Sequence, residues 1–216
     1  MITKDLSQYQ DLFSEYTELR VQENRSLNIL SVNGDILGNS KQTQNGVSAR
    51  VYQNGSWGFA SSSEFGQADI KKVIVSAREN AIALDSKEKK NKPALPTAQA
   101  EKTVDFSTRK NRFSQKELID FVKSIDDHIK QNCPKLISRT VSLQCLDMKK
   151  TTITADQSYS YSMIPRSVLY IMMSTLDDQG NPVELYDIVG ARGQFEDVFS
   201  SIDNPVPPSG AYIRRA

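Results

Sequence analysis

The residue types that most often carry enzyme chemistry are scarce in this chain. Its 216 residues include one histidine, His128, and two cysteines, Cys133 and Cys145. Zinc hydrolases and the Ser-His-Asp and Cys-His enzymes all need at least one histidine in a defined geometry. His128 lies in the segment IDDHIK of a predicted helix, where neighbouring Asp126 and Asp127 point in other directions. We therefore interpret His128 as a partly exposed helix residue and expect no metal site around it.

Other catalytic signatures are missing as well. The sequence contains no P-loop and no GxGxxG segment. Neither cysteine has a histidine at a useful spacing, so both are predicted to be buried structural thiols. The pair Asp177-Asp178 is more typical of a turn than of a general acid and base. The sequence thus predicts no catalytic, cofactor-binding or metal-ligating residue within this chain.

The most unusual stretch is NGVSARVYQNGSWGFASSS, residues 45–63, which places an arginine and three aromatic residues around one glycine turn. If Asn54 and Gly55 form a two-residue hairpin turn, cross-strand partners share a face of the sheet. The predicted pairs are Gln53–Ser56, Tyr52–Trp57, Val51–Gly58, Arg50–Phe59 and Ala49–Ala60. The large face then carries Arg50, Tyr52, Trp57 and Phe59. The small face carries Val47, Ala49, Val51, Gly58 and Ala60.

The two faces have different expected roles. The small face lets a helix approach closely, and the next segment along the chain is a predicted helix. The large face has two interpretations. It is either a second core layer, in which Arg50 stacks on an aromatic ring or pairs with an acid, or the wall of a cleft that faces a peptide or a partner domain. Core packing is the more common arrangement, and the sequence leaves both open.

The elements that position this hairpin alternate between strands and helices. A short helix is predicted around Leu6–Phe13, followed by strands in YTELRVQ and SLNILSV and a hairpin turn at Asn33-Gly34. A helix from Gln67 to Asp85 has one apolar stripe, made of Ile70, Val73, Ile74, Ala77, Ala81 and Leu84. The Lys- and Pro-rich stretch that follows, residues 87–101, predicts a solvated connector.

The second half begins with a capping box, Ser114 followed by Glu117, at the start of a helix that ends before Pro134. Its predicted buried stripe is Leu118, Phe121, Val122, Ile125 and Ile129. Strands are predicted in RTVSLQCLDM, KTTITAD, RSVLYIMMSTL and PVELYDIVGA. Within these, VLYIMM is apolar on both alternating faces, which predicts a strand in the middle of a sheet covered on both sides.

Together these patterns predict an α+β fold of one or more mainly antiparallel sheets with about three packed helices. The predicted domain covers residues 1–200, with sub-halves 1–86 and 102–200 joined by the connector 87–101, and residues 201–216 form a tail.

Composition and charge limit the class of partner. The chain has 27 Lys and Arg against 26 Asp and Glu. With this balance we expect no general attraction to nucleic acid or to an anionic membrane. No apolar run approaches the roughly 20 residues of a membrane span, and the polar start lacks the apolar stretch of a signal peptide. We therefore expect a cytoplasmic protein without direct nucleic-acid or membrane contacts.

The order of these segments resembles the N-terminal half of the TldD/PmbA proteins, historically labelled modulators of DNA gyrase. The resemblance rests on Glu18-Leu19-Arg20, on Gly46 to Val51 and on Gly58 to Ser61, which match the family's ElR segment, G-x-x-x-R-v turn and G-f-a-s run in order and spacing. The closing strands are also similar. The family's GGRGGFE-like segment is GARGQFE here, residues 190–196, with two glycines replaced. The resemblance extends from about residue 10 to about residue 200.

The resemblance implies one part of a zinc metallopeptidase. In the family an HExxxH helix and a later cysteine, all in the C-terminal half, hold the zinc, and the glutamate can take a proton from the bound water. This chain has no HExxxH. Zinc is therefore expected only in a C-terminal half that the sequence does not contain, and whether the chain is itself an enzyme stays open.

The resemblance also implies partners. These are the catalytic half or a TldD/PmbA-like subunit, in a homo- or hetero-dimer, and an extended, unfolded peptide. Exposed strand edges suit such a peptide because they offer backbone groups whatever its side chains.

Two functional hypotheses follow. The chain is either the N-terminal, substrate-cleft and assembly domain of a TldD/PmbA-type peptidase, inactive alone, or a stand-alone protein-interaction module that uses the large face. A third, modulation of DNA topology by direct contact, is disfavoured by the near-zero net charge.

Overall fold

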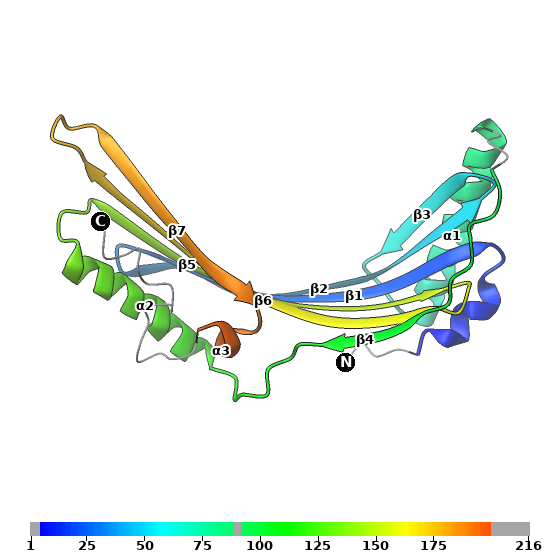
Figure 1. Ribbon diagram of the computed structural model, residues 1–216, viewed down its shortest axis with the longest axis horizontal. Helices are drawn as coiled ribbons and strands as arrows, with labels where there is room; N and C mark the ends of the chain where they lie inside the picture. Colours follow the sequence, from blue (N-terminus) through cyan, green and yellow to red (C-terminus); the bar gives the residue numbers. More distant parts are fainter. Residues whose placement is uncertain (1–4, 89–91, 200–216) are drawn as a thin grey trace. The chain divides into compact units, whose positions relative to one another are not determined.

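The structure is a computed structural model that describes residues 5–88 and 92–199. The elements in chain order are the 3-10 helix η1 (Ser7–Leu12), β1 (Tyr16–Val32), β2 (Asp35–Gln53), β3 (Ser56–Ser62), α1 (Gln67–Glu88), β4 (Glu101–Asp105), α2 (Gln115–Asn132), β5 (Ser138–Thr154), β6 (Tyr159–Leu176), β7 (Pro182–Arg192) and α3 (Phe195–Val198) (Figure 1).

The strands form a seven-stranded sheet in the order β3-β2-β1-β5-β6-β4, with β7 also paired to β6. The pairs β2–β3 and β6–β7 are antiparallel, whereas β4 runs parallel to β6. The predicted α+β class with a mainly antiparallel sheet is confirmed.

Two predicted pairs of strands are single long strands. YTELRVQ and SLNILSV both lie in β1, and RTVSLQCLDM and most of KTTITAD lie in β5. The sequence suggested a break in each because polar residues interrupt the alternation near the middle of the strand, but the backbone continues through them.

The chain divides into two compact units that are interleaved in sequence. Unit 1 takes its described residues from the ranges 1–24, 43–105 and 148–163, and unit 2 from 25–42, 106–147 and 164–216. The strands β1, β2, β5 and β6 each contribute residues to both units. Each predicted sub-half, 1–86 and 102–200, therefore supplies parts of both units, and the proposed domain division stays a prediction.

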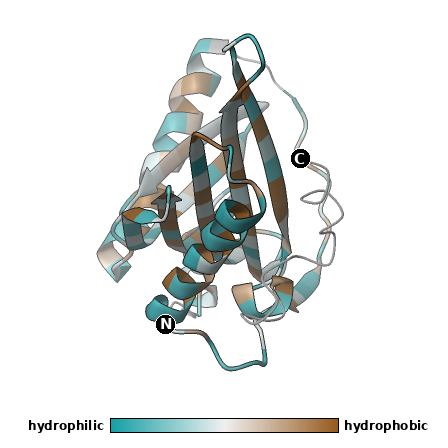
Figure 2. Cartoon of the chain, turned by 90° about the vertical axis from the view of Figure 1, so that its left-hand side faces the viewer, coloured by the Kyte–Doolittle hydropathy of each residue, from teal (hydrophilic) through white to brown (hydrophobic). Residues whose placement is uncertain are grey.

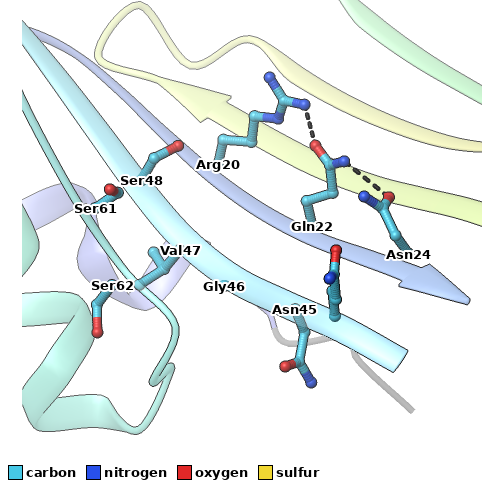
Figure 3. Close-up of a pocket in the computed structure, with 10 residues that line it drawn as sticks. Arg20, Gln22, Asn24, Asn45, Gly46, Val47, Ser48, Ser61 and Ser62 are labelled. Carbon is cyan, nitrogen blue, oxygen red and sulfur yellow. Dashed lines mark hydrogen bonds between the residues drawn. The ribbon is translucent and has the colours of Figure 1, made fainter. Parts of the chain in front are cut away.

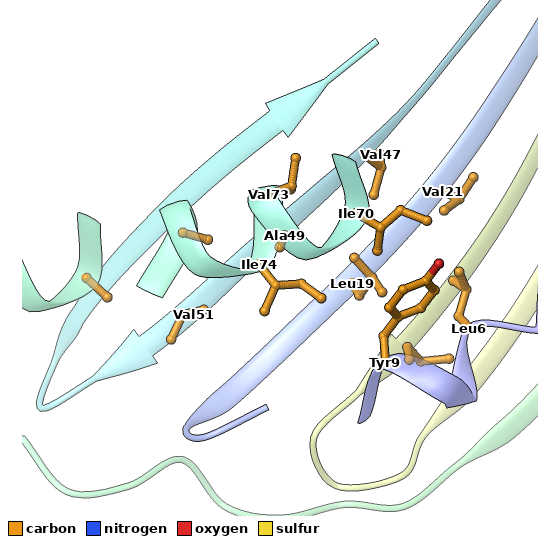
Figure 4. Close-up of a cluster of buried hydrophobic side chains, with 13 residues drawn as sticks. Leu6, Tyr9, Leu19, Val21, Val47, Ala49, Val51, Ile70, Val73 and Ile74 are labelled. Carbon is orange, nitrogen blue, oxygen red and sulfur yellow. The ribbon is translucent and has the colours of Figure 1, made fainter. Parts of the chain in front are cut away.

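The core of unit 1 lies between α1 and the small face of the β2–β3 hairpin (Figure 4). The Asn54-Gly55 turn has positive φ at both residues, 52° and 102°. The observed register pairs Tyr52 with Trp57 and Arg50 with Phe59, as predicted. The small-face residues Val47, Ala49 and Val51 are at most 2% exposed.

Close approach of α1 depends on the small side chains of this face. A Cβ atom added to Gly58 would lie 2.0 Å from the carbonyl oxygen of Ala77 and 2.2 Å from the amide nitrogen of Ala81. Both alanines are fully buried. The predicted function of the small face, to admit a helix, is confirmed.

The core of unit 2 forms under α2. The predicted capping box is present, because Ser114 Oγ accepts from the Glu117 amide and Glu117 Oε2 accepts from the Ser114 amide. The predicted stripe is buried against residues of β1, β5 and β6, and Phe195 of α3 joins the same cluster. A buried ion pair between Asp126 and Arg139, with 3.1 Å between Oδ1 and Nε, ties α2 to β5.

β6 lies in the middle of the sheet, between β5 on one side and β4 and β7 on the other, as predicted. The prediction that it is covered on both faces is wrong. Leu169 and Ile171 are buried under α2, but Tyr170 and Met172, which point the other way, are 37% and 46% exposed. Figure 2 shows alternating hydrophobic and hydrophilic bands along the strands. Among the described residues no element covers the second face, although its residues are apolar.

The predicted connector is only partly without regular structure. Helix α1 extends through Lys87 to Glu88, residues 89–91 lie outside the described part, and residues 92–100 form no helix or strand. The predicted tail, residues 201–216, also lies outside the described residues.

None of the described helices is long and apolar enough to span a lipid bilayer.

Candidate functional site

The side chains of unit 1 that point away from α1 form one continuous surface. Leu19 and Val21 of β1 are buried against α1, so the alternation of the strand directs Glu18, Arg20 and Gln22 to the opposite side. We name this surface the open face. It consists of Tyr16, Glu18, Arg20, Gln22 and Asn24 of β1, Ser48, Arg50 and Tyr52 of β2, and Trp57, Phe59 and Ser61 of β3.

An ion pair occupies the middle of the open face. Arg50 donates from Nε to Glu18 Oε2 at 2.6 Å and from Nη2 to Glu18 Oε1 at 2.8 Å, a two-point contact. The hydrogen bond from Glu18 raises the pKa of the Arg50 guanidinium, against a smaller opposing effect of burial. The Arg50 Cζ atom also lies 4.8 Å from the centroid of the Trp57 ring. Arg50 thus makes both predicted contacts, the stack and the acid pair, while its side chain stays 54% exposed.

Aromatic rings surround this pair. Trp57 meets Tyr16 edge-on with 5.9 Å between centroids, and meets Tyr52 with 5.2 Å between centroids. Tyr52 is buried, whereas Trp57 is 38% and Phe59 is 59% exposed. These are exposures of an open surface and not of a second core layer. The idea that the face forms a cleft wall stays a prediction.

Tyr16 lies in a negative environment. Its hydroxyl donates to Glu18 Oε1 at 3.1 Å. Burial, followed by the charge of Glu18, raises the pKa of the Tyr16 phenol to about 12. Tyr16 is therefore neutral at any physiological pH and serves as a hydrogen-bond donor.

The segment after α1 covers one end of the open face. The Tyr52 hydroxyl donates to the carbonyl oxygen of Pro93 at 3.0 Å, and the Lys92 amide donates to the carbonyl oxygen of Asn54 at 3.0 Å. A pocket of about 290 Å³ remains here, lined by Tyr16, Tyr52, Leu95 and Asp156 among others. The hairpin turn and the predicted connector thus build this pocket together.

A polar groove of about 250 Å³ lies at the other end (Figure 3). Arg20 Nη2 donates to Gln22 Oε1, and Gln22 Nε2 donates to Asn24 Oδ1 at 2.8 Å. Ser48 and Ser61 line the same groove. Side-chain amides and hydroxyls both donate and accept hydrogen bonds, as a peptide backbone requires.

The groove residues were missed by the sequence reasoning, although a signal for them exists. In ELRVQEN the polar residues alternate with Leu19 and Val21, and this period of two places the polar residues on one face. The Asn54-Gly55 turn specifies the register of β2 and β3 alone, so it does not assign the residues of β1 to this face.

The remaining candidates for chemistry lie elsewhere and do not converge. His128 is half-buried on α2, and its Nδ1 atom lies 3.5 Å from the side-chain nitrogen of Asn132. In the ranges 5–88 and 92–199, no group of three or more His, Cys, Asp or Glu side chains is placed to hold a metal ion. The donor set of the described residues therefore does not fit zinc, and no hydrolytic step is assigned to them.

The surroundings of Cys133, of Cys145 and of the pair Asp177-Asp178 are those of structural residues. Cys133 and Cys145 are free thiols and partly buried. Burial raises the pKa of the Cys145 thiol to about 11, so it is protonated at neutral pH. Asp177 Oδ1 accepts from the amides of Gln179 and Asn181 at 2.9 and 2.8 Å, which confirms the predicted turn between β6 and β7.

Comparisons with known proteins give one match in sequence and several in fold. Residues 17–81, which contain most of the open face, match the sequence family described as PmbA/TldA metallopeptidase domain 1. No curated protein matches the chain in sequence.

Several solved structures share the fold. TldE from Thermococcus kodakarensis has a TM-score of 0.62 at 10% identity and covers 92% of this chain. Two proteins assigned provisionally as modulators of DNA gyrase are also similar. The one from Thermotoga maritima has a TM-score of 0.64 at 16% identity over 82% of this chain, and the one from Bacteroides thetaiotaomicron a TM-score of 0.66 at 10% identity over 85%. The aligned part spans only 40–45% of those three proteins.

Proposed function

We propose that this chain is the substrate-cleft and assembly domain of a TldD/PmbA-type zinc metallopeptidase, a proposal supported by the match of residues 17–81 to the family described as PmbA/TldA metallopeptidase domain 1. Its substrate in this proposal is an unfolded peptide. The chain contains no HExxxH segment, so it is inactive alone and depends on a catalytic half or on a related subunit that supplies the zinc site.

The observation that carries the proposal is the chemistry of the open face. A sheet face on the surface of a protein ordinarily exposes charged and small polar residues, but this one exposes Trp57 and Phe59 beside the ordered Glu18–Arg50 pair. Aromatic rings give contact area at a low cost in conformational entropy because they have few rotatable bonds. The open face can therefore contact a ligand without first reorganising.

The two ends of the open face suit an extended chain of variable sequence. The rings and the pocket beside Tyr52 offer apolar contact to side chains. The groove of Arg20, Gln22 and Asn24 offers donors and acceptors to backbone amides and carbonyls. This combination binds a peptide by groups that every peptide has, as an enzyme for unfolded substrates needs.

The experiment mixes the chain with a separately expressed half that carries HExxxH and measures cleavage of a labelled unfolded peptide with and without zinc. Neither part alone should cleave, and the mixture should. Trp57→Ala should weaken peptide binding roughly fivefold, because one aromatic contact contributes about 1 kcal/mol. The control is Val75→Ala, which removes an apolar side chain that is 50% exposed from α1.

Two results contradict the proposal. If Trp57→Ala lowers the free energy of unfolding but leaves peptide binding unchanged, the open face is structural. If the chain binds peptide but no half that carries HExxxH restores cleavage, the chain is a stand-alone interaction module. The exposed aromatic residues also support this alternative.

A further inference from the structure

The pocket of about 290 Å³ beside Tyr52 lies wholly within unit 1 and has a mixed lining. Tyr16 and Tyr52 contribute aromatic rings, Leu95 contributes an apolar side chain, and Glu15 and Asp156 contribute carboxylates. None of the described residues that line the pocket carries a positive charge. The lining therefore complements a ligand that is apolar along its length and positive at its end.

The two carboxylates differ in how they are held. Asp156 Oδ1 accepts from the Thr154 hydroxyl, and Asp156 Oδ2 accepts from the Ala98 amide at 3.1 Å. These hydrogen bonds lower the pKa of the Asp156 carboxyl, so it is negatively charged at neutral pH. Glu15 directly precedes β1, and its carboxylate makes no hydrogen bond or ion pair with another described residue. The pocket thus has one fixed acid and one acid that is free to turn toward a ligand.

The two tyrosines offer their rings to the pocket, because their hydroxyls are bound elsewhere. Tyr16 donates to Glu18, and Tyr52 donates to the carbonyl oxygen of Pro93. Aromatic rings attract a nearby cation through their π electrons. Arg50 of the open face does not provide that cation, since Glu18 holds it at two points. The negative charge of the pocket lining is therefore left for a ligand to neutralise.

The cation that suits this lining is organic. In the ranges 5–88 and 92–199, no group of three or more His, Cys, Asp or Glu side chains is placed to hold a metal ion. Lysine and arginine side chains combine an apolar stem with a cationic end. The stem can pack on Leu95 and the rings, and the ammonium or guanidinium group can meet the carboxylates of Glu15 and Asp156.

We propose that this pocket takes a lysine or arginine side chain of the bound peptide, so that unit 1 selects peptides with a basic residue. The inference rests on the proposed function, in which an extended peptide lies along the open face. Tyr16 and Tyr52 belong both to that face and to the pocket, so a peptide on the face lies beside the pocket. The pocket adds a sequence preference to a surface whose polar groove contacts any peptide backbone.

The test compares three unstructured, fluorescently labelled peptides that differ at one position, which holds lysine, arginine or norleucine. Norleucine has the stem of lysine without its amine. Anisotropy titrations with the whole chain give the dissociation constants. The lysine and arginine peptides should each bind about fivefold more tightly than the norleucine peptide, because a partly exposed ion pair and a cation–π contact are each modest.

Substitutions in the pocket locate this preference. Glu15→Gln and Asp156→Asn each remove one charge with little change of shape, and each should about halve the preference for lysine over norleucine. The double variant should have a preference below about twofold and should bind the norleucine peptide as the wild type does. Glu79→Gln is the matched control, because it removes the charge of an exposed glutamate on α1 and should keep the full preference.

A second measurement needs no peptide. Nα-acetyl-lysine amide should bind with a dissociation constant on the order of 1 mM, as a ligand of this size does. It should shift the NMR signals of the Tyr16 and Tyr52 rings, and its norleucine counterpart should shift them less.

The proposal is overturned if the wild type binds the lysine and norleucine peptides equally, if the double variant keeps the preference, or if Glu79→Gln loses as much of it. Peptide binding without any preference overturns the basic-side-chain pocket and leaves the proposed function standing. Binding of the capped lysine without binding of any peptide does the reverse.

Discussion

Replacing Gly58 by alanine tests how closely α1 approaches the β2–β3 hairpin. The added Cβ would lie 2.0 Å from the Ala77 carbonyl oxygen, whereas ordinary contacts begin at 3.4 Å. The obstacle is the backbone of a helix, which cannot rotate away as a flexible side chain does. To restore an ordinary contact, the helix would have to move away until this distance grows from 2.0 Å to 3.4 Å.

Withdrawal of α1 would loosen the whole core of unit 1. Ile70, Val73 and Ile74 of α1 are at most 5% exposed and pack against the same strands as Gly58. Overfilling a packed core costs about 1–3 kcal/mol. Because the contact is with backbone at two atoms, we expect Gly58→Ala to cost about 3 kcal/mol, near the upper end of that range. In a protein of this size that is a fall in melting temperature of about 6–12 °C.

The assay is urea unfolding, with hydrogen exchange of the α1 amides to locate the loss in unit 1. The control is Gly38→Ala in β2, where the added Cβ would meet only the Leu30 side chain, at 3.3 Å. It should cost less than about 1 kcal/mol. If Gly58→Ala unfolds within about 1 kcal/mol of the wild type, the argument from close helix packing is refuted.

Three further outcomes follow from single side chains. Arg50→Lys should lower the free energy of unfolding by less than about 1 kcal/mol, because the Arg50 side chain of the ion pair is 54% exposed. Urea unfolding of this variant beside Glu18→Gln checks this. The pKa of Tyr16 is raised from 10.0 to about 12, so the stability it contributes is complete below pH 10 and is lost as the pH rises to 12. Tyr16→Phe should therefore lose less stability than the wild type between about pH 10 and about pH 12. Burial raises the pKa of Cys145 to about 11, so at neutral pH the folded thiol should react slowly with a disulfide reagent. After unfolding, the reaction should be more than about a hundredfold faster. The rate is measured in the Cys133→Ser variant so that Cys133 does not contribute.

The features that the sequence predicted correctly are local. The Asn54-Gly55 turn fixes its register by itself, because a two-residue loop determines which residues lie opposite each other. The capping box of Ser114 and Glu117 is likewise a contact between residues three positions apart. The alternation of small and large residues then assigned the faces of β2 and β3 without knowledge of the rest of the fold.

The features that the sequence missed depend on distant segments. The parallel pairing of β4 with β6 joins residues far apart in the chain, and no local pattern specifies it. The exposed face of β6 was missed for a related reason. Apolar residues on both faces indicate burial on both faces only when something covers each of them, and the sequence of a strand does not show what covers it.

The candidate site was half predicted. Arg50, Tyr52, Trp57 and Phe59 do share a face, but the third strand of that face, β1, was not assigned to it. The pairing of Arg50 with Glu18 joins positions 32 residues apart. The sequence predicted that Arg50 would have an acid partner and could not identify which of the chain's acids it would be.

The two units use the same arrangement to present different surfaces. Each packs one long helix against one face of its strands. The other face carries exposed apolar or aromatic side chains, although in unit 1 the segment after α1 covers one end of it. In unit 1 that face carries an ion pair, amides and aromatic rings, which suit reversible contact with a hydrated peptide backbone. In unit 2 it carries Tyr186, Ile188 and Met172 beside a strand edge, which suit permanent contact because burial of apolar area drives association. A change at Trp57 should therefore alter peptide binding, and a change at Tyr186 should leave it intact.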